Sequence, residues 1–80
     1  MKRIELLPKW YGKEERKDRT NKMNAAKEEL ISSELLPIKA KEKVKTITCN
    51  MDMIADTYSR NYEIKAMNTY IDLCNALSRT

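Results

Sequence analysis

Apolar side chains recur at the spacing of one helix face along residues 40–58. They stand at steps of four, three, four, three and four residues, at Ala40, Val44, Ile47, Met51, Ile54 and Tyr58. This spacing keeps side chains on one side of an α-helix, so it predicts a helix over residues 37–58. The β-branched run at residues 44–49 is compatible with a short strand instead. A strand needs a partner, and only the segment around residues 3–6 could supply one, so we favour the helix.

A second apolar run follows in a shifted phase and again keeps helical spacing. Its residues are Ile64, Met67, Ile71 and Cys74, flanked by Tyr62, Ala66, Tyr70, Leu73 and Leu77. Ser59 or Asn61 can cap a new helix, because a short polar side chain there accepts from free backbone N–H groups. The pattern predicts a helix over residues 61–79. It forms a hairpin with the helix before it or continues that helix through a bend.

The stretch at residues 13–22 contains no apolar side chain. Acid-before-base pairs four residues apart, such as Asp18/Lys22, nevertheless favour helix there. The apolar positions that follow are Met23, Ala26, Leu30, Ile31 and Leu35. We therefore predict one helix over residues 13–35, with a core-facing side only in its second half. Its first half should project into solvent or onto a partner.

Residues 1–12 combine apolar side chains with Pro8 and Gly12, which prevent a long helix. The tetrapeptide Glu-Leu-Leu-Pro ends at Pro8 and occurs again at residues 34–37, where it marks a boundary between two helices. So many apolar side chains should not be left in water. We expect this arm to cover either the chain's own helices or a groove of a partner. The candidate partner-binding residues are Trp10, Tyr11, Leu6 and Leu7.

The composition favours an all-α fold, because 80 residues contain one Gly and two Pro and are rich in Lys, Glu, Ala, Leu and Met. We predict a single small helical domain over residues 1–80, an extended arm followed by about three helices. A chain of this length is near the lower limit for a self-sufficient core. Two or three helices cannot cover both apolar stripes and the arm, so we expect a homo-oligomer, a dimer first of all, to complete the bundle.

Positive charge is concentrated in the first part of the chain. Residues 1–45 hold thirteen Lys and Arg against eight Asp and Glu, whereas residues 46–80 hold three against four. Basic side chains can contact phosphates, so nucleic-acid binding is a possible function. The candidate residues are Lys9, Lys13, Arg16, Lys17, Arg19, Lys22, Lys39, Lys41, Lys43 and Lys45. Acidic residues are interspersed with them, so a solvated basic surface is the simpler interpretation.

The chain lacks the residue patterns of catalysis. It has no His and only one Gly, which excludes His-based sites and Gly-rich phosphate loops, and its two Cys form no CxxC pair. We therefore predict no catalytic residue, no metal site and no cofactor, and a protein that is not an enzyme. Cys49 and Cys74 should be buried free thiols in a reducing cytoplasm, or else form one disulfide. No segment has the length of a membrane span, and the apolar run before Pro8 is too short for a signal peptide.

These observations favour a function in protein–protein interaction. Four of the five Met lie among the apolar faces, and Met adapts its packing to different partners. We expect a cytoplasmic regulator or adaptor that binds an unidentified protein target, with nucleic-acid binding as the alternative. The short, Lys-, Asn- and Ile-rich chain also has the style of accessory proteins of phages or mobile elements with AT-rich genomes.

Overall fold

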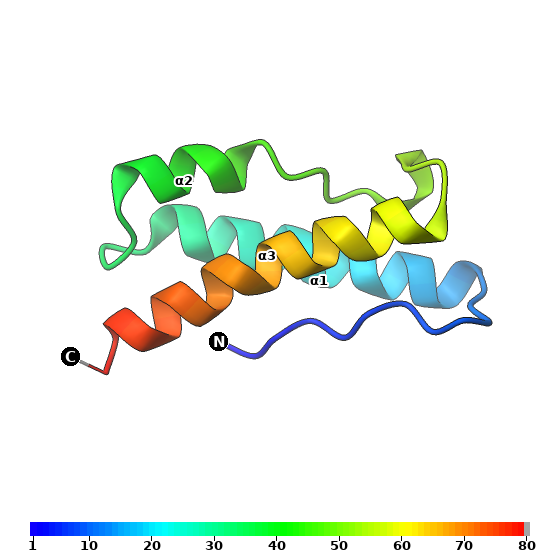
Figure 1. Cartoon of the computed structure of the whole chain (residues 1–80), viewed down its shortest axis with the longest axis horizontal. Coiled ribbons are helices and arrows are strands. Elements are labelled where there is room, and N and C mark those ends of the chain that lie inside the picture. Colours follow the sequence, from blue (N-terminus) through cyan, green and yellow to red (C-terminus); the bar gives the residue numbers. More distant parts are fainter. Residues whose placement is uncertain (80) are drawn as a thin grey trace.

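The computed structural model describes residues 1–79 as three α-helices and one 3₁₀ turn (Figure 1). α1 spans Lys13–Ser32, α2 spans Ile38–Lys45, η1 spans Met51–Met53 and α3 spans Thr57–Leu77. The described residues contain no strand, so the all-α prediction is confirmed.

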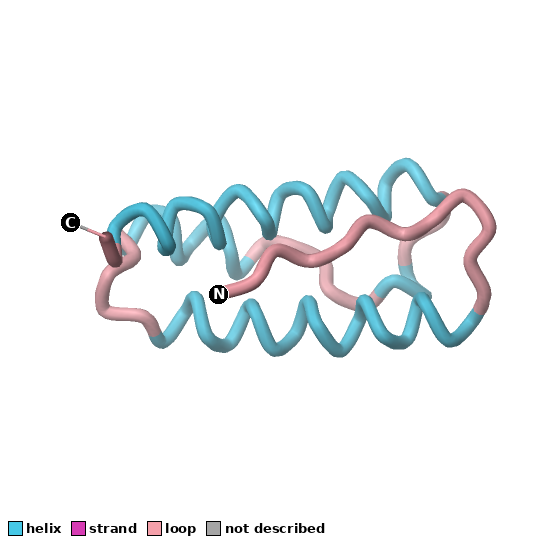
Figure 2. The backbone as a smooth tube through the Cα atoms, turned by 90° about the horizontal axis from the view of Figure 1, so that it is seen from below, coloured by secondary structure: helices cyan, strands magenta, loops and turns pink. Residues whose placement is uncertain are grey.

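α1 and α3 form the frame of the molecule. They run in the same direction along its 39 Å length, and two segments run back along them on opposite sides of the pair (Figures 1 and 2). One returning segment is the arm, residues 1–12. The other consists of α2 and the residues that follow it. We name residues 46–56 the connector. The frame therefore has an irregular segment on each side.

The core lies between α1 and α3 and is closed by both returning segments. Its buried apolar side chains are Ile4, Leu7, Met23, Ala26, Leu30, Leu36, Val44, Ile47, Cys49, Met51, Ile64, Met67, Ile71 and Cys74. Burying a large aliphatic side chain contributes about 1.5–3 kcal/mol relative to leaving it in water. A short chain thus gains stability by bringing its irregular segments, as well as its helices, into the core.

The helix expected over residues 37–58 ends at Lys45, and the alternative strand does not form either. The apolar spacing was right about burial, since Val44, Ile47 and Met51 are all in the core. It was wrong about the backbone. Extended chain advances about 3.3 Å per residue and a helix only about 1.5 Å, so the connector can return to the end of the frame where α3 begins.

The connector can leave the helical conformation because side chains of the frame bond its backbone. Thr20 Oγ1 accepts the Met51 N–H at 3.0 Å, and Glu63 Oε2 accepts the Thr48 N–H at 3.0 Å. Lys27 Nζ donates to two carbonyls at the end of α2 and the start of the connector, at 3.0 and 3.1 Å. These bonds replace those that a longer helix would have made internally.

Local capping explains the remaining helix boundaries. The first predicted helix, 13–35, ends at Ser32, and the Ser33 hydroxyl accepts the Leu35 N–H at 3.2 Å. The last helix begins at Thr57, earlier than predicted, because Asp56 Oδ1 accepts the Ser59 N–H at 2.8 Å. The cap is thus Asp56, and neither Ser59 nor Asn61 occupies that position.

Candidate interaction surfaces

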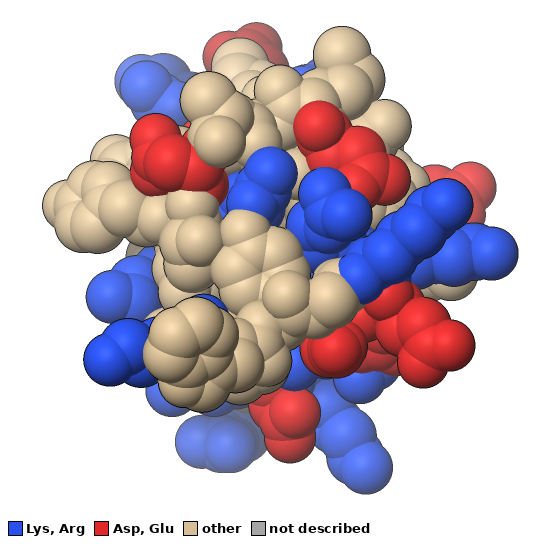
Figure 3. Space-filling model, turned by 90° about the vertical axis from the view of Figure 1, so that its right-hand side faces the viewer, with Lys and Arg blue, Asp and Glu red and all other residues tan. Residues whose placement is uncertain are grey.

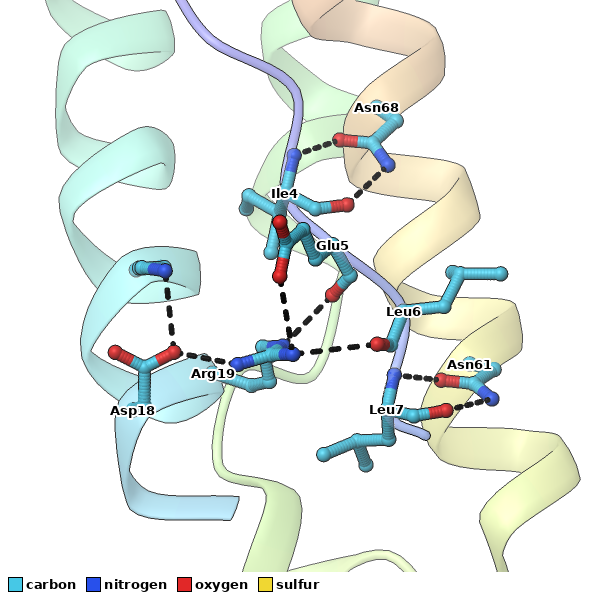
Figure 4. A network of polar contacts seen from close by, with 9 residues as sticks. Ile4, Glu5, Leu6, Leu7, Asp18, Arg19, Asn61 and Asn68 are labelled. Carbon is cyan, nitrogen blue, oxygen red and sulfur yellow. Dashed lines mark hydrogen bonds and ion pairs between the residues drawn. The ribbon is translucent and has the colours of Figure 1, made fainter. Parts of the chain in front are cut away.

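Asparagine side chains of α3 bind the backbone of the arm (Figure 4). Asn68 Oδ1 accepts the Ile4 N–H at 2.7 Å, and Asn68 Nδ2 donates to the Ile4 carbonyl at 2.9 Å. Asn61 makes the same two bonds with Leu7, at 2.8 and 3.3 Å. Each side-chain amide thus pairs with the N–H and C=O of one residue, as a neighbouring strand would.

A third asparagine extends this arrangement, which we name the asparagine ladder. Asn75 pairs with the backbone nitrogen and the carbonyl of Met1, both at 2.9 Å. The three asparagines are seven residues apart, and their partners in the arm are three apart. Seven helical residues rise about 10.5 Å, and three extended residues span about 9–10 Å. The two repeats therefore stay in register along the arm.

Arg19 of α1 binds the arm from the opposite side of the groove (Figure 4). Its Nε donates to the Glu5 carbonyl at 2.8 Å, and its Nη2 donates to the Leu6 carbonyl at 3.3 Å. The carboxylates of Asp18, at 2.6 Å, and Glu5, at 3.6 Å, balance its charge. Arg19 is only 8% exposed. Arg19 therefore packs under the arm, contrary to the expectation that the first half of α1 projects into solvent or onto a partner. The expectation holds for the exposed side chains of this half, which are Lys13, Glu14, Lys17, Asn21 and Lys22.

Asp18 connects this network to the surface of α1. Its carboxylate accepts from Lys22 Nζ at 3.2 Å as well as from Arg19, so the predicted pair Asp18/Lys22 is present. The hydrogen bond from Lys22, followed by that from Arg19, holds the pKa of the Asp18 carboxyl below its ordinary value. The carboxylate therefore remains charged and available to Arg19 at neutral pH.

Arg60 of α3 joins the end of the arm to the connector. Its Nε donates to the Met51 carbonyl at 2.7 Å, and its Nη1 donates to the Tyr11 hydroxyl. The guanidinium also lies 5.5 Å from the centre of the Tyr11 ring. The same hydroxyl shares a hydrogen bond of 3.0 Å with Thr57. Tyr11 is thereby fixed at the start of α3.

The structure separates the four residues predicted to bind a partner. Leu7 lies in the core at 4% exposure, and Tyr11 is half-buried. Leu6 is exposed, and Trp10 is 85% exposed with Lys9 Nζ 5.9 Å from its ring centre. The arm therefore covers its own helices with some of these side chains. Only Leu6 and Trp10 remain accessible to another molecule.

The outer side of α3 carries an apolar surface that is not part of the core. Tyr58 is 82% and Tyr62 is 62% exposed, and Leu73 is also exposed. Ala66 and Tyr70 are partly buried at its edge. These five residues, which we name the α3 face, follow one another at steps of four or three and so share one side of the helix. No charged residue is among them.

Trp10 belongs to the end of the molecule where the arm turns into α1 and where α3 begins (Figure 1). Figure 3 shows uncharged surface at this end beside intermingled acidic and basic side chains. Exposed apolar side chains of the segments that meet there are Trp10, Met53 and Tyr58. The end of the molecule thus offers aromatic contacts close to the first turn of α3.

The ten candidate nucleic-acid-binding residues are spread over the arm, α1 and α2. Arg19 is buried under the arm, and Lys22 pairs with Asp18. Arg16 pairs with Asp52 of η1 at 3.1 Å. The other seven are Lys9, Lys13, Lys17, Lys39, Lys41, Lys43 and Lys45. Three of the ten charges are therefore engaged within the fold.

Both cysteines are buried and unbridged. Cys74 Sγ lies 3.6 Å from the Ser33 hydroxyl, and Cys49 Sγ donates to the Ile47 carbonyl at 3.6 Å. Burial raises the pKa of the Cys49 thiol, which favours its protonated form. Residues 1–79 contain no group of three or more His, Cys, Asp or Glu that could hold a metal ion. Over the same residues, no helix is both long and apolar enough to cross a membrane.

The asparagine ladder is not among the features predicted from the sequence. Asn61 was predicted only as a helix cap, and no role was predicted for Asn68 or Asn75. Their seven-residue spacing is nevertheless visible in the sequence, as is the three-residue recurrence of apolar residues in the arm. These two spacings are the signal in the sequence that corresponds to the pairing.

Comparisons with protein-family models, curated proteins and solved structures find no match for this chain. The surfaces themselves are therefore the basis for inferring a function. Two are distinct in position and chemistry. The groove that holds the arm bonds its backbone and buries its apolar side chains, whereas the α3 face is apolar and accessible.

Proposed function

We propose that this protein is a small non-enzymatic regulator or adaptor that acts by protein–protein interaction, with a second copy of itself as its first partner. The observation that carries the proposal is the α3 face. A helix that is apolar on the side facing the core and again on its outer side is typical of one that packs against a further helix. Aromatic side chains such as Tyr58 and Tyr62 supply large contact areas at low entropic cost.

Two copies of α3 can bury this face against each other around a two-fold axis. Three residues of the face can form a seam together with Thr69 and Ala76, because these five positions follow steps of four and three, the spacing at which helices pack: Tyr62, Ala66, Thr69, Leu73 and Ala76. A two-fold interface uses the same residues from both subunits. Each substitution in the face therefore acts twice in the dimer.

The proposed dimer leaves Trp10 and Leu6 as contacts for an unidentified protein target. We place this activity in the cytoplasm, in the manner of accessory proteins of phages and mobile elements. Nucleic-acid binding receives less support, because Arg16, Arg19 and Lys22 are engaged within the fold. At the end of the molecule shown in Figure 3, acidic side chains also lie among the basic ones.

Sedimentation equilibrium over a range of protein concentrations tests the dimer. Tyr62→Lys and Leu73→Lys should each raise its dissociation constant by about 100-fold, because each places two charges in an apolar interface. Ile38→Lys is the matched control, since Ile38 is an exposed apolar residue of α2 outside the face and should leave dimerisation unchanged. Circular dichroism verifies that all three variants remain helical.

Salt separates the two functional classes. An apolar dimer should persist at about 1 M salt, whereas binding to random duplex should weaken steeply between about 0.05 and 0.2 M. A protein that is monomeric at every concentration, or a dimer unaffected by Tyr62→Lys, would contradict the proposed surface. Salt-sensitive duplex binding by such a monomer would favour the nucleic-acid alternative.

A further inference from the structure

We propose that the groove between α1 and α3 also accepts the arm of a second copy, so that two chains exchange their arms reciprocally. The groove is lined by the asparagine ladder and Arg19 (Figure 4), and its occupant is an extended segment with inward side chains at every third position. This inference does not rest on the α3 face. Tyr62 is about 100° around the helix from Asn61, so the two surfaces point in different directions.

The contacts in the groove depend on the sequence of the arm and not on the connection of the arm to α1. The ladder makes six hydrogen bonds, all to the backbone of Met1, Ile4 and Leu7. Arg19 adds bonds to two further carbonyls. The arm of a second copy would make every one of them. Exchange of an identical element requires no new interface, which makes it a low-cost route to a dimer.

The segment between the arm and α1 is suited to act as a hinge. Pro8, Lys9 and Trp10 are exposed, and within residues 1–79 none of them makes a hydrogen bond. α1 also begins independently of the arm's position, because the Glu15 carboxylate caps the Gly12 N–H at 3.0 Å from within the helix. Straightening residues 8–10 therefore breaks no hydrogen bond of these three residues and leaves the start of α1 intact.

The groove selects its occupant by two requirements, which the arm of a second copy fulfils. Apolar side chains must stand three residues apart, as Ile4 and Leu7 do, since both are buried. The residues at those positions must have a free N–H for Asn68 and Asn61, so Pro is excluded. A peptide from another protein could satisfy the same rules. The second copy satisfies them with the same residues 1–12 and with Glu5 opposite Arg19.

Cross-linking between two differently substituted full-length chains tests the exchange. Arg3 of the arm and Asp72 of α3 form an exposed ion pair at 3.5 Å, so both positions tolerate substitution. One chain carries Arg3→Cys, the other carries Asp72→Cys, and a short bis-maleimide joins nearby thiols. The expected product is a covalent heterodimer linked between positions 3 and 72, identified by mass spectrometry, with a yield that rises with protein concentration. The unsubstituted chain, whose two cysteines are buried, is the reagent control.

Two further substitutions identify the contact responsible. Ile4→Asp in the Arg3→Cys chain should reduce the heterodimer about tenfold or more, because it buries a charge in the groove. Tyr62→Lys in both chains removes the α3 face, so the heterodimer that still forms in this background comes from exchange of the arms, and a failure of the α3 face is not mistaken for a failure of exchange. A third chain with both Arg3→Cys and Asp72→Cys reports an arm seated in its own groove. The proposal is overturned if, at every concentration, cross-links form within the doubly substituted chain but not between two chains. It is also overturned if no cross-link forms within or between chains.

Discussion

The arm and the connector are two irregular segments that pack on opposite sides of the same pair of helices, and their backbones are bonded in different ways. Each has a buried arginine from the frame whose Nε donates to one of its carbonyls. Arg19 donates to Glu5 at 2.8 Å on the arm side, and Arg60 donates to Met51 at 2.7 Å on the connector side. Each arginine thus gives a backbone carbonyl a charged donor, and the Met51 carbonyl also accepts the Ile54 N–H at 3.4 Å.

The remaining bonds differ in kind. On the connector side, Thr20, Lys27 and Glu63 each make a different contact, and no spacing recurs. On the arm side, asparagines that are seven residues apart in α3 bond the backbone of arm residues that are three apart. A regular set of backbone contacts defines a groove for an extended segment. An irregular set fixes one particular connection between two helices.

Arg60 is the residue that belongs to both sides, and its loss should have the largest effect. Arg60→Ala is expected to lower the free energy of unfolding by about 3 kcal/mol, because it removes the charged donor of the Met51 carbonyl and of the Tyr11 hydroxyl and leaves only their contacts with Ile54 and Thr57. Urea unfolding followed by circular dichroism measures this. Arg16→Ala, which breaks only a surface pair with Asp52, should cost less than about 1 kcal/mol. Equal losses would contradict the importance of the buried contact.

The asparagine ladder should be strongest where it is most buried. Asn68→Leu keeps a similar volume but leaves the buried Ile4 N–H and carbonyl unpaired, so we expect a loss of about 2 kcal/mol. Asn75→Leu should cost less than about 1 kcal/mol, because water can replace its bonds at the half-buried end. The same urea experiment compares them. A loss at Asn68 no larger than at Asn75 would exclude burial as the cause.

The smallest effect concerns acid stability on the arm side. The pKa of Asp18 is lowered in the folded protein, so its carboxylate stabilises the fold fully above the unfolded value of about 3.9. This contribution is lost as the pH falls through the lower pKa of the folded state. Asp18→Asn should therefore flatten the decrease of the melting temperature between about pH 4 and pH 2. Parallel curves for the two proteins would contradict the role of Asp18.

The sequence predicted the helices best where apolar spacing and helix propensity agree. Met23, Ala26 and Leu30 of α1 and Ile64, Met67 and Ile71 of α3 are buried as expected. In the connector the spacing predicted which side chains are buried but not the conformation of the backbone. The deciding contacts come from Thr20, Glu63 and Arg60, which are distant in sequence. Periodicity within one segment cannot reveal a hydrogen-bond partner in another.

The candidate surfaces were predictable only in part. The exposure of Trp10 and the burial of Leu7 depend on which side of the arm faces the frame, and that is set by the register of the ladder. Arg19 looked like one of many surface charges, because its partners are backbone carbonyls of a segment without regular structure. Tyr62 and Leu73 were identified only as flanks of the core face. The structure shows that both are exposed on the outer side of α3.

Amide hydrogen exchange along the arm tests the ladder most directly. Ile4 and Leu7 donate their N–H groups to Asn68 and Asn61, whereas within residues 1–79 the N–H groups of Glu5 and Leu6 have no acceptor. We predict that the Ile4 and Leu7 amides exchange at least about tenfold more slowly than the two between them, measured by NMR on the native protein. Uniform exchange across residues 4–7, whether fast or slow, would contradict a ladder that bonds every third residue.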